Sequence, residues 1–224
     1  MLRAAVFDLD GTITKLTLPL DAMRRDTKNY FLTRGLPPHI LDPDDGISSS
    51  TQKARAYFLS RGLSEDAWLK MEREVDDLLS RHEGLAANGV ELIEGALSAV
   101  HRIRGAGLKT AILTNNGRVA VNMILQRVPL DEYFDIIQTR NESPSPKPFP
   151  EGIVHLLTRL GVRIDEAVYV GDARIDAAAA ARAGIEFIGV ATGETSAEVL
   201  RSVGATHVFL SLESVADHIL GRLS

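Results

Sequence analysis

The sequence of 224 residues contains no cysteine. This absence excludes disulfide bonds, thiolate nucleophiles, zinc–thiolate sites and iron–sulfur clusters. Long apolar stretches are also absent, since none approaches the length of a membrane span. The first residues lead directly into a buried strand, without room for a signal peptide. We therefore expect a cytoplasmic protein without a membrane partner.

An excess of positive charge is lacking as well. The chain has 30 acidic against 25 basic residues and a formal net charge of −5. Such a balance gives no broad attraction to nucleic acid, so we expect no nucleic-acid partner. The hydrophobic share of 45% and the length suit a soluble protein with one large domain or a core plus a smaller module. Both a monomer and a homodimer fit this composition.

The stretch AAVFDLDGT at residues 4–12 organises the rest of the chain. Its apolar start predicts a short buried strand. Asp8 and Asp10 follow at alternate positions, so their side chains can point the same way at the strand's carboxyl end. Gly11 allows a sharp turn there. Two carboxylates held close together repel each other, and a bound cation or a shared proton relieves that repulsion.

Residues 16–88 lack a strongly apolar strand and instead show helical patterns. Amphipathic helices are predicted at 20–32 and 50–59, and a further one begins after Ser64, whose hydroxyl suits a helix N-cap. Trp68 lies on the apolar face of this last helix. The segment therefore predicts a small helical domain inserted into a core formed by residues 1–15 and 89–224.

Residues 89–224 alternate between apolar strands and helices. Strands are predicted at 108–114, 134–138, 167–171, 187–190 and 206–210. Helices are predicted at 94–105, 118–126, 151–160, 176–183 and 213–220. Near-continuous apolar strands that alternate with helices indicate an α/β fold with a doubly wound, mostly parallel sheet covered on both faces.

Polar groups follow four of these strands. Besides Asp8 and Asp10, they are Thr114 and Asn115 after the second strand, Lys147 in the loop after the third, and Asp172 and Asp176 after the fourth. In a doubly wound sheet these strand ends share one edge. The set suits phosphoryl transfer, because a lysine, a hydroxyl and a metal can share the charge of a phosphate. Hard carboxylate oxygens suit Mg²⁺, and a carboxylate is the natural nucleophile of this set.

Four motifs resemble those of the haloacid dehalogenase-like hydrolase superfamily, in the expected order. They are FDLDGTIT at residues 7–14, LTNNG at 113–117, KPFPE at 147–151 and VGDARID at 170–176. Motifs that occur together in the predicted strand-end context are far more specific than one alone. The helical segment resembles the cap domain of the phosphoglycolate phosphatase-like branch, where such caps close over the site and select the substrate.

This resemblance implies roles for the polar residues. Asp8 would be the nucleophile and a magnesium ligand, and Asp10 the general acid and base, with its backbone carbonyl on the metal. Thr114, the backbone amide of Asn115 and Lys147 would bind the phosphate. Asp172 would be a further magnesium ligand, and Asp176 would hold a metal-bound water or brace Lys147. The expected protein is a magnesium-dependent phosphatase that acts on a small phosphorylated metabolite through an aspartyl-phosphate.

Several other functions share some of these features. A phosphosugar mutase has the same motifs and stays open. A haloacid dehalogenase generally lacks the second aspartate of the first motif, so Asp10 argues against it. A phosphonate hydrolase would need an amine in the cap, and nothing marks Lys53 or Lys70 for that role. A phospho-receiver domain is about half as long, and a non-catalytic interaction protein would be expected to have lost a key group.

Two further groups of polar residues could have a function. Arg24, Arg25 and Lys28 could meet a substrate carboxylate, but such clusters are more often a solvated helix face. His101, His155 and His207 show no metal-ligand spacing in the sequence, so the sequence alone predicts no metal site at any of them.

Overall fold

The computed structural model describes residues 1–223, which fall into two compact units. One comprises Met1–Thr17 together with the chain from Gly89 onward, and the other comprises Leu18–Asn88. Our division of the sequence assigned residues 16 and 17 to the helical segment, whereas here they belong to the first unit. None of the described helices is both long and apolar enough to cross a membrane.

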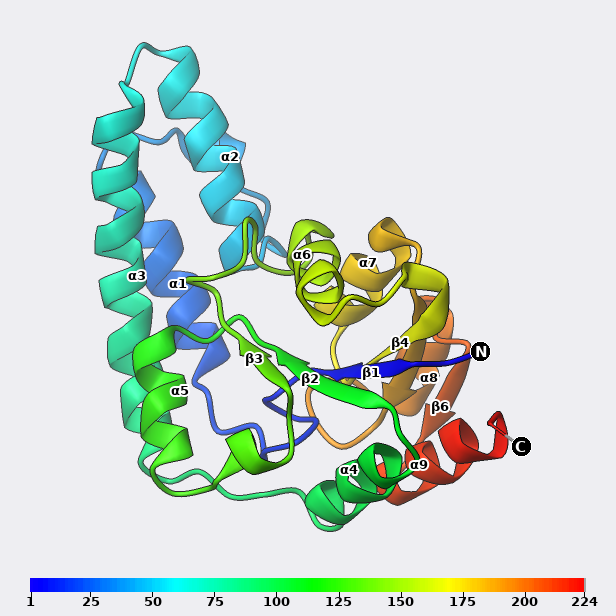
Figure 1. Cartoon of the computed structure of the whole chain (residues 1–224). Helices are drawn as coiled ribbons and strands as arrows, with labels where there is room; N and C mark the ends of the chain where they lie inside the picture. The colour runs from blue at the N-terminus through cyan, green and yellow to red at the C-terminus, as the bar shows by residue number, and fades with distance from the viewer. Residues whose placement is uncertain (224) are drawn as a thin grey trace. The chain divides into compact units, whose positions relative to one another are not determined.

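The first unit is built on a six-stranded sheet in the order β3-β2-β1-β4-β5-β6 (Figure 1). The strands are β1 (Ala4–Phe7), β2 (Lys109–Leu113), β3 (Ile136–Gln138), β4 (Ala167–Gly171), β5 (Glu186–Val190) and β6 (His207–Phe209). Every neighbouring pair runs parallel. This arrangement confirms the predicted α/β fold with a doubly wound, parallel sheet.

Helices cover both faces of this sheet. They are α4 (Ala96–Gly105), α5 (Arg118–Leu125), α6 (Glu151–Leu160), α7 (Arg174–Ala183), α8 (Ala197–Ser202) and α9 (Leu212–Gly221), with short 3-10 turns η2 (Leu130–Glu132) and η3 (Ile164–Glu166). Figure 1 shows α6 and α7 on one face and α4 and α9 on the other. Because both faces are covered, all residues of β1 are fully buried, which explains the unbroken apolar run of that strand.

The helix α8 was missed by the sequence interpretation, although its signals are present. The Ser196 hydroxyl accepts a hydrogen bond from the Val199 amide and so caps the helix. Gly204 follows soon after with a φ of 100°. A helix of six residues offers too little periodicity to be recognised from its pattern alone.

The second unit is helical, as its sequence predicts. It contains α1 (Leu20–Leu32), η1 (Pro38–Ile40), α2 (Ile47–Ser60) and α3 (Glu65–Ala87). The rings of Phe31 and Trp68 stack in its core with centroids 6.0 Å apart. Ser64 caps α3, with its hydroxyl accepting a hydrogen bond from the Ala67 amide at 3.2 Å. The unit therefore has its own small hydrophobic core.

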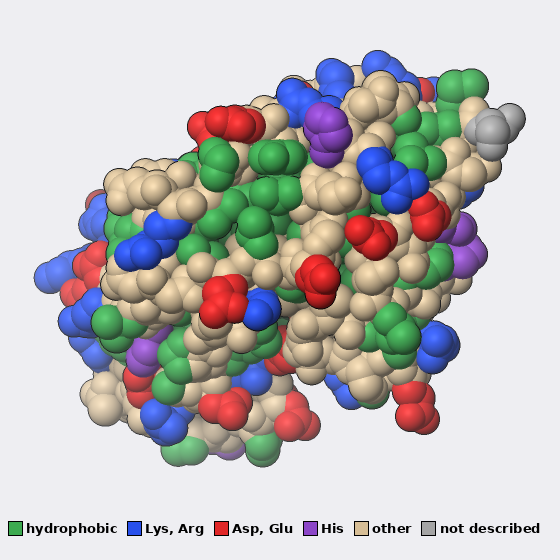
Figure 2. Space-filling view, turned by 90° about the horizontal axis from the view of Figure 1, so that it is seen from below, with side chains coloured by type: hydrophobic (Ala, Val, Ile, Leu, Met, Phe, Trp, Pro, Cys, Tyr) green, Lys and Arg blue, Asp and Glu red, His purple; other side chains and the backbone are tan. Residues whose placement is uncertain are grey.

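Charged side chains of both signs are interspersed on the face shown in Figure 2. Exposed ion pairs also join neighbouring elements, such as Arg102 with Asp217 at 2.6 Å between α4 and α9. Pairs of this kind are each worth about 0–1 kcal/mol, so they add little to the stability supplied by the core.

Candidate active site

The carboxyl ends of the central strands lie at one level of the sheet. Phe7, the last residue of β1, is in register with Ile112 on β2 and Val170 on β4. The next residue, Asp8, donates its backbone N–H to the carbonyl of Val170 at 2.9 Å. The side chains that follow these strands therefore meet at one edge of the sheet, where ligands bind in folds of this kind.

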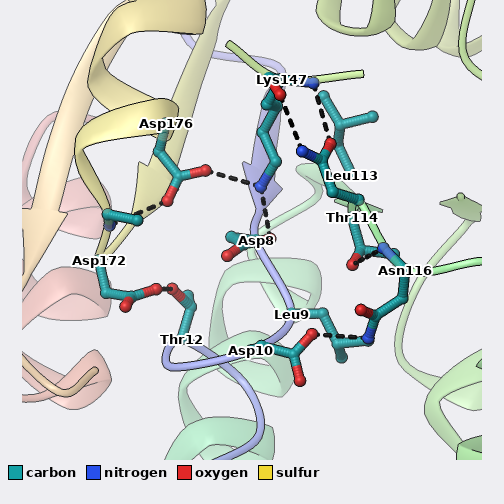
Figure 3. Close-up of polar contacts among 12 residues, drawn as sticks. Asp8, Leu9, Asp10, Thr12, Leu113, Thr114, Asn116, Lys147, Asp172 and Asp176 are labelled. Carbon is teal, nitrogen blue, oxygen red and sulfur yellow. Dashed lines mark hydrogen bonds and ion pairs between the residues drawn. The ribbon is translucent and has the colours of Figure 1, made fainter. Parts of the chain in front are cut away.

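Lys147 lies between two carboxylates at this edge (Figure 3). Its Nζ atom is 2.6 Å from Oδ1 of Asp8 and 2.7 Å from Oδ1 of Asp176. Only 2% of the lysine surface is exposed. Burial alone would lower the pKa of Lys147, but the charges of Asp176 and Asp8 outweigh burial and raise this pKa well above its usual value. Lys147 therefore supplies a fixed positive charge beside Asp8.

Asp176 is held in place by its surroundings. Besides Lys147, its Oδ1 atom accepts a hydrogen bond from the Tyr169 hydroxyl at 3.2 Å, and its Oδ2 atom accepts one from the Ala173 amide at 3.0 Å. The carboxylate also lies so close to Gly171 that a Cβ atom there would be 2.5 Å from Oδ2. Asp176 can therefore contact Lys147 because Gly171, which has no side chain, leaves room for the Asp176 carboxylate.

Asp172 lies beside the loop that follows β1. Its Oδ1 atom accepts a hydrogen bond from the Thr12 hydroxyl at 3.0 Å, and its Oδ2 atom accepts one from the Glu194 amide at 2.7 Å. A Cβ atom on Gly11 or Gly193 would lie 2.3 or 2.1 Å from Oδ2. Two loops can therefore approach this carboxylate closely only because each carries a glycine.

Thr114 and Asn115 follow β2 at the same edge. Thr114 is buried, and its hydroxyl oxygen accepts a hydrogen bond from the Asn116 amide at 3.0 Å. The Asn115 side chain binds the backbone of Lys147 twice, accepting from its N–H at 2.9 Å and donating to its carbonyl at 2.8 Å. The Asn115 side chain thus positions the lysine loop, and the predicted phosphate contact of Asn115 stays assigned to its backbone amide.

Asp10 points toward Asn116 rather than toward Asp8 (Figure 3). The Asn116 side-chain amide donates to Oδ2 of Asp10 at 2.7 Å. Asn116 is buried, so it holds Asp10 in one orientation. The two aspartates of the first motif therefore have different partners, Lys147 for Asp8 and Asn116 for Asp10.

The electrostatics of the edge favour a divalent cation. Burial and the charge of Asp176 raise the pKa of Asp8 to about 8, although Lys147 opposes this shift. The same two causes raise the pKa of Asp172 to about 7. Oxygen atoms of Asp8, Asp172 and Asp176 lie within 4.8 Å of one another. A divalent cation held between these carboxylates would relieve their mutual repulsion, and hard oxygen ligands of this kind suit Mg²⁺.

Sequence reasoning missed three residues of this arrangement. Asn116 directly follows the Thr114–Asn115 pair, so its position was a signal that could have been used. Thr12 lies within the first motif, but its contact with a carboxylate far along the chain leaves no local pattern. Tyr169 lies in an apolar strand, so the sequence predicts a residue of the hydrophobic core. Nothing in the sequence shows where its hydroxyl points.

Comparison with known proteins fits this geometry. The sequence profile described as "Haloacid dehalogenase-like hydrolase" matches residues 5–190, which include the four motifs and the strand-end residues from Asp8 to Asp176. The chain belongs to the haloacid dehalogenase-like hydrolase family. The resemblance drawn from the four motifs, and with it the prediction of an enzyme of this family, is therefore confirmed.

Relatives within this family match nearly the whole chain. A phosphoglycolate phosphatase from Rhodobacter capsulatus is 28% identical, over 97% of this chain and 98% of the relative. The pyrophosphatase PpaX of Bacillus velezensis is 32% identical, over 97% of this chain and 96% of the relative. The crystal structure of a hydrolase from Pseudomonas syringae has the same fold, with a TM-score of 0.66, 21% identity and 98% coverage of both chains.

Proposed function

We propose that this protein is a magnesium-dependent phosphatase that hydrolyses a small phosphorylated metabolite through an aspartyl-phosphate on Asp8. The observation that carries this proposal is the buried ammonium of Lys147, bound to both Asp8 and Asp176. It places a positive charge next to the nucleophile, where the charge of a transferring phosphoryl group develops. The relatives named as phosphatases and a pyrophosphatase support phosphate-bearing substrates as a class.

The residues divide the reaction between them. Lys147 binds Oδ1 of Asp8, and the other oxygen attacks phosphorus, so that an O–P bond forms while the bond to the leaving oxygen breaks. Asp10 donates a proton to that leaving oxygen. In the second step Asp10 accepts a proton from water, which attacks the aspartyl-phosphate and regenerates Asp8. Thr114 and the Asn115 amide hold the phosphate oxygens in both steps.

The carboxylates of Asp8 and Asp172, with the backbone carbonyl of Asp10, would hold the magnesium ion. When bound, this ion neutralises charge on the phosphate and keeps both carboxylates ionised at neutral pH. Thr12 and the Glu194 amide hold Asp172 in position for this role.

The decisive experiment measures phosphate release from sugar phosphates, nucleotides, pyrophosphate and short phospho-acids. We expect Mg²⁺-dependent turnover of at least one of them, abolished by a chelator and lowered at least about a thousandfold by Asp8→Asn. Asp165→Asn, in an exposed ion pair with Arg163, is the matched control and should leave the rate unchanged. Undiminished turnover by the Asp8 variant would refute the mechanism, and isomerisation of a sugar phosphate would assign a mutase instead.

A further inference from the structure

A cluster of two histidines and a glutamate lies at the opposite edge of the sheet. Glu186 and His207 are the first residues of the parallel strands β5 and β6, whereas the active site follows the carboxyl ends of the strands. His218 joins them from α9. One ring nitrogen of each histidine and one oxygen of Glu186 lie within 4.8 Å of one another.

The two imidazoles are held side by side. Their ring centroids are 4.1 Å apart, and the His207 ring also stacks on Phe209 with an angle of 6° between the planes. The Nε2 atom of His218 is buried and has no hydrogen-bond partner in the described part of the chain. A buried polar atom left unpaired destabilises the fold, so this nitrogen would gain from a ligand.

We propose that Glu186, His207 and His218 form a binding site for Zn²⁺ or a similar transition-metal ion, separate from the active site. Two imidazoles and a carboxylate are a common zinc ligand set, and they leave a position for water.

Metal binding requires a limited rearrangement. Zinc–nitrogen bonds of about 2.0–2.1 Å place neighbouring ligand atoms about 3.4 Å apart. The three candidate ligand atoms here lie within 4.8 Å of one another, so they must move closer together. His207 is exposed, which leaves its side chain more freedom to adjust than a buried one would have. Glu186 now forms a two-armed ion pair with Arg222, at 3.0 and 2.9 Å, and accepts a hydrogen bond from Thr206. Arg222 therefore competes with the metal for Glu186, and its removal should strengthen metal binding.

The test is a calorimetric titration. Protein stripped of metal is placed in excess Mg²⁺, which occupies the active site, and Zn²⁺ is then added while the heat of binding is measured. We expect one Zn²⁺ ion per chain, with an affinity lowered at least about tenfold in His207→Ala and in His218→Ala. Arg222→Gln should bind Zn²⁺ more tightly than the wild-type chain. His101→Ala, which removes an exposed histidine of α4, is the matched control and should bind Zn²⁺ normally.

Two further measurements separate this site from the active site and from effects on folding. Asp172→Asn should retain the Zn²⁺ ion, because it alters only the active-site carboxylates. In the wild-type chain, the ring resonances of His207 and His218 should shift together as Zn²⁺ is added. Unchanged Zn²⁺ affinity in both histidine variants, loss of the ion in Asp172→Asn, or unmoved ring resonances would each overturn the proposal.

Discussion

A single methyl group at Gly171 would disturb the active site through Asp176. The backbone of Gly171 lies outside the left-handed region, so alanine adds no backbone strain. Its Cβ atom, however, would lie 2.5 Å from Oδ2 and 2.6 Å from Cγ of Asp176. Ordinary contacts are about 3.5–4.0 Å, so the carboxylate must retreat by about 1 Å. We therefore expect Gly171→Ala to detach Asp176 from Lys147, which loses one of its two carboxylate partners.

The size of this effect follows from the hydrogen bonds of Asp176. It accepts from Lys147 at 2.7 Å, from Tyr169 at 3.2 Å and from the Ala173 amide at 3.0 Å. A bond to a charged group is worth about 1.5–3 kcal/mol and a neutral one about 1 kcal/mol. Loss of the lysine bond and one other predicts that the free energy of unfolding falls by ~3 kcal/mol.

Urea unfolding measures this change, and phosphate release reports the accompanying loss of activity, which we expect to be at least about a hundredfold. Gly105→Ala is the matched control, since a Cβ atom at this helical residue would meet nothing within 4 Å. This variant should be neutral or more stable by up to ~1 kcal/mol. A Gly171→Ala protein within about 0.5 kcal/mol of wild type, with an undiminished rate, would refute the assigned role of Asp176.

Three further predictions concern single contacts. Tyr169→Phe removes one hydrogen bond to Asp176 and should lower kcat about tenfold with KM unchanged. A raised KM at constant kcat would contradict a positioning role for Tyr169. Asn116→Ala removes the hydrogen bond that orients Asp10 and should likewise lower kcat, measured as phosphate release. Asn116→Asp should be equally slow, because an ionised carboxylate cannot donate a hydrogen bond to Asp10. Burial alone would raise the pKa of Glu142, but Arg118 and Thr139 lower it to about 2, so the ionised form contributes stability above the unfolded pKa of 4.5. Because the side chain is partly exposed, we expect ~1–2 kcal/mol, measured as the difference in unfolding free energy between wild type and Glu142→Gln. This difference should shrink as the pH falls from about 4.5 toward 2, and a gap that does not change with pH would contradict the assignment.

The sequence was sufficient to predict the fold and to name the polar residues that follow the strands. Buried parallel strands carry continuous apolar runs, which made most strands visible, and the ranges of β4 and α6 match their predicted bounds. The polar residues at strand ends share an edge because parallel register requires it. Long periodic helices such as α1 were equally clear, whereas the short α8 was not.

The partners of each site residue could not be predicted in the same way. The motifs named Asp8 and Asp10, but not that one faces Lys147 and the other Asn116. The side chain of Asn115 proved to hold the lysine backbone, a contact between loops that no local pattern encodes. Such contacts depend on side-chain direction and loop approach, and these follow from the whole fold rather than from spacing.

The position of β1 in the middle of the sheet has a consequence for how the protein acquires activity. Both neighbours of β1 come much later in the chain, and the contacts that join Asp8 to Lys147 and Thr12 to Asp172 span 139 and 160 residues. Contacts between such distant residues form slowly, because long loops must close first. During synthesis, β1 therefore cannot pair with β2 and β4 until most of the chain has been made. We therefore expect catalytic competence to come late in folding, so that recovery of activity would report a complete core.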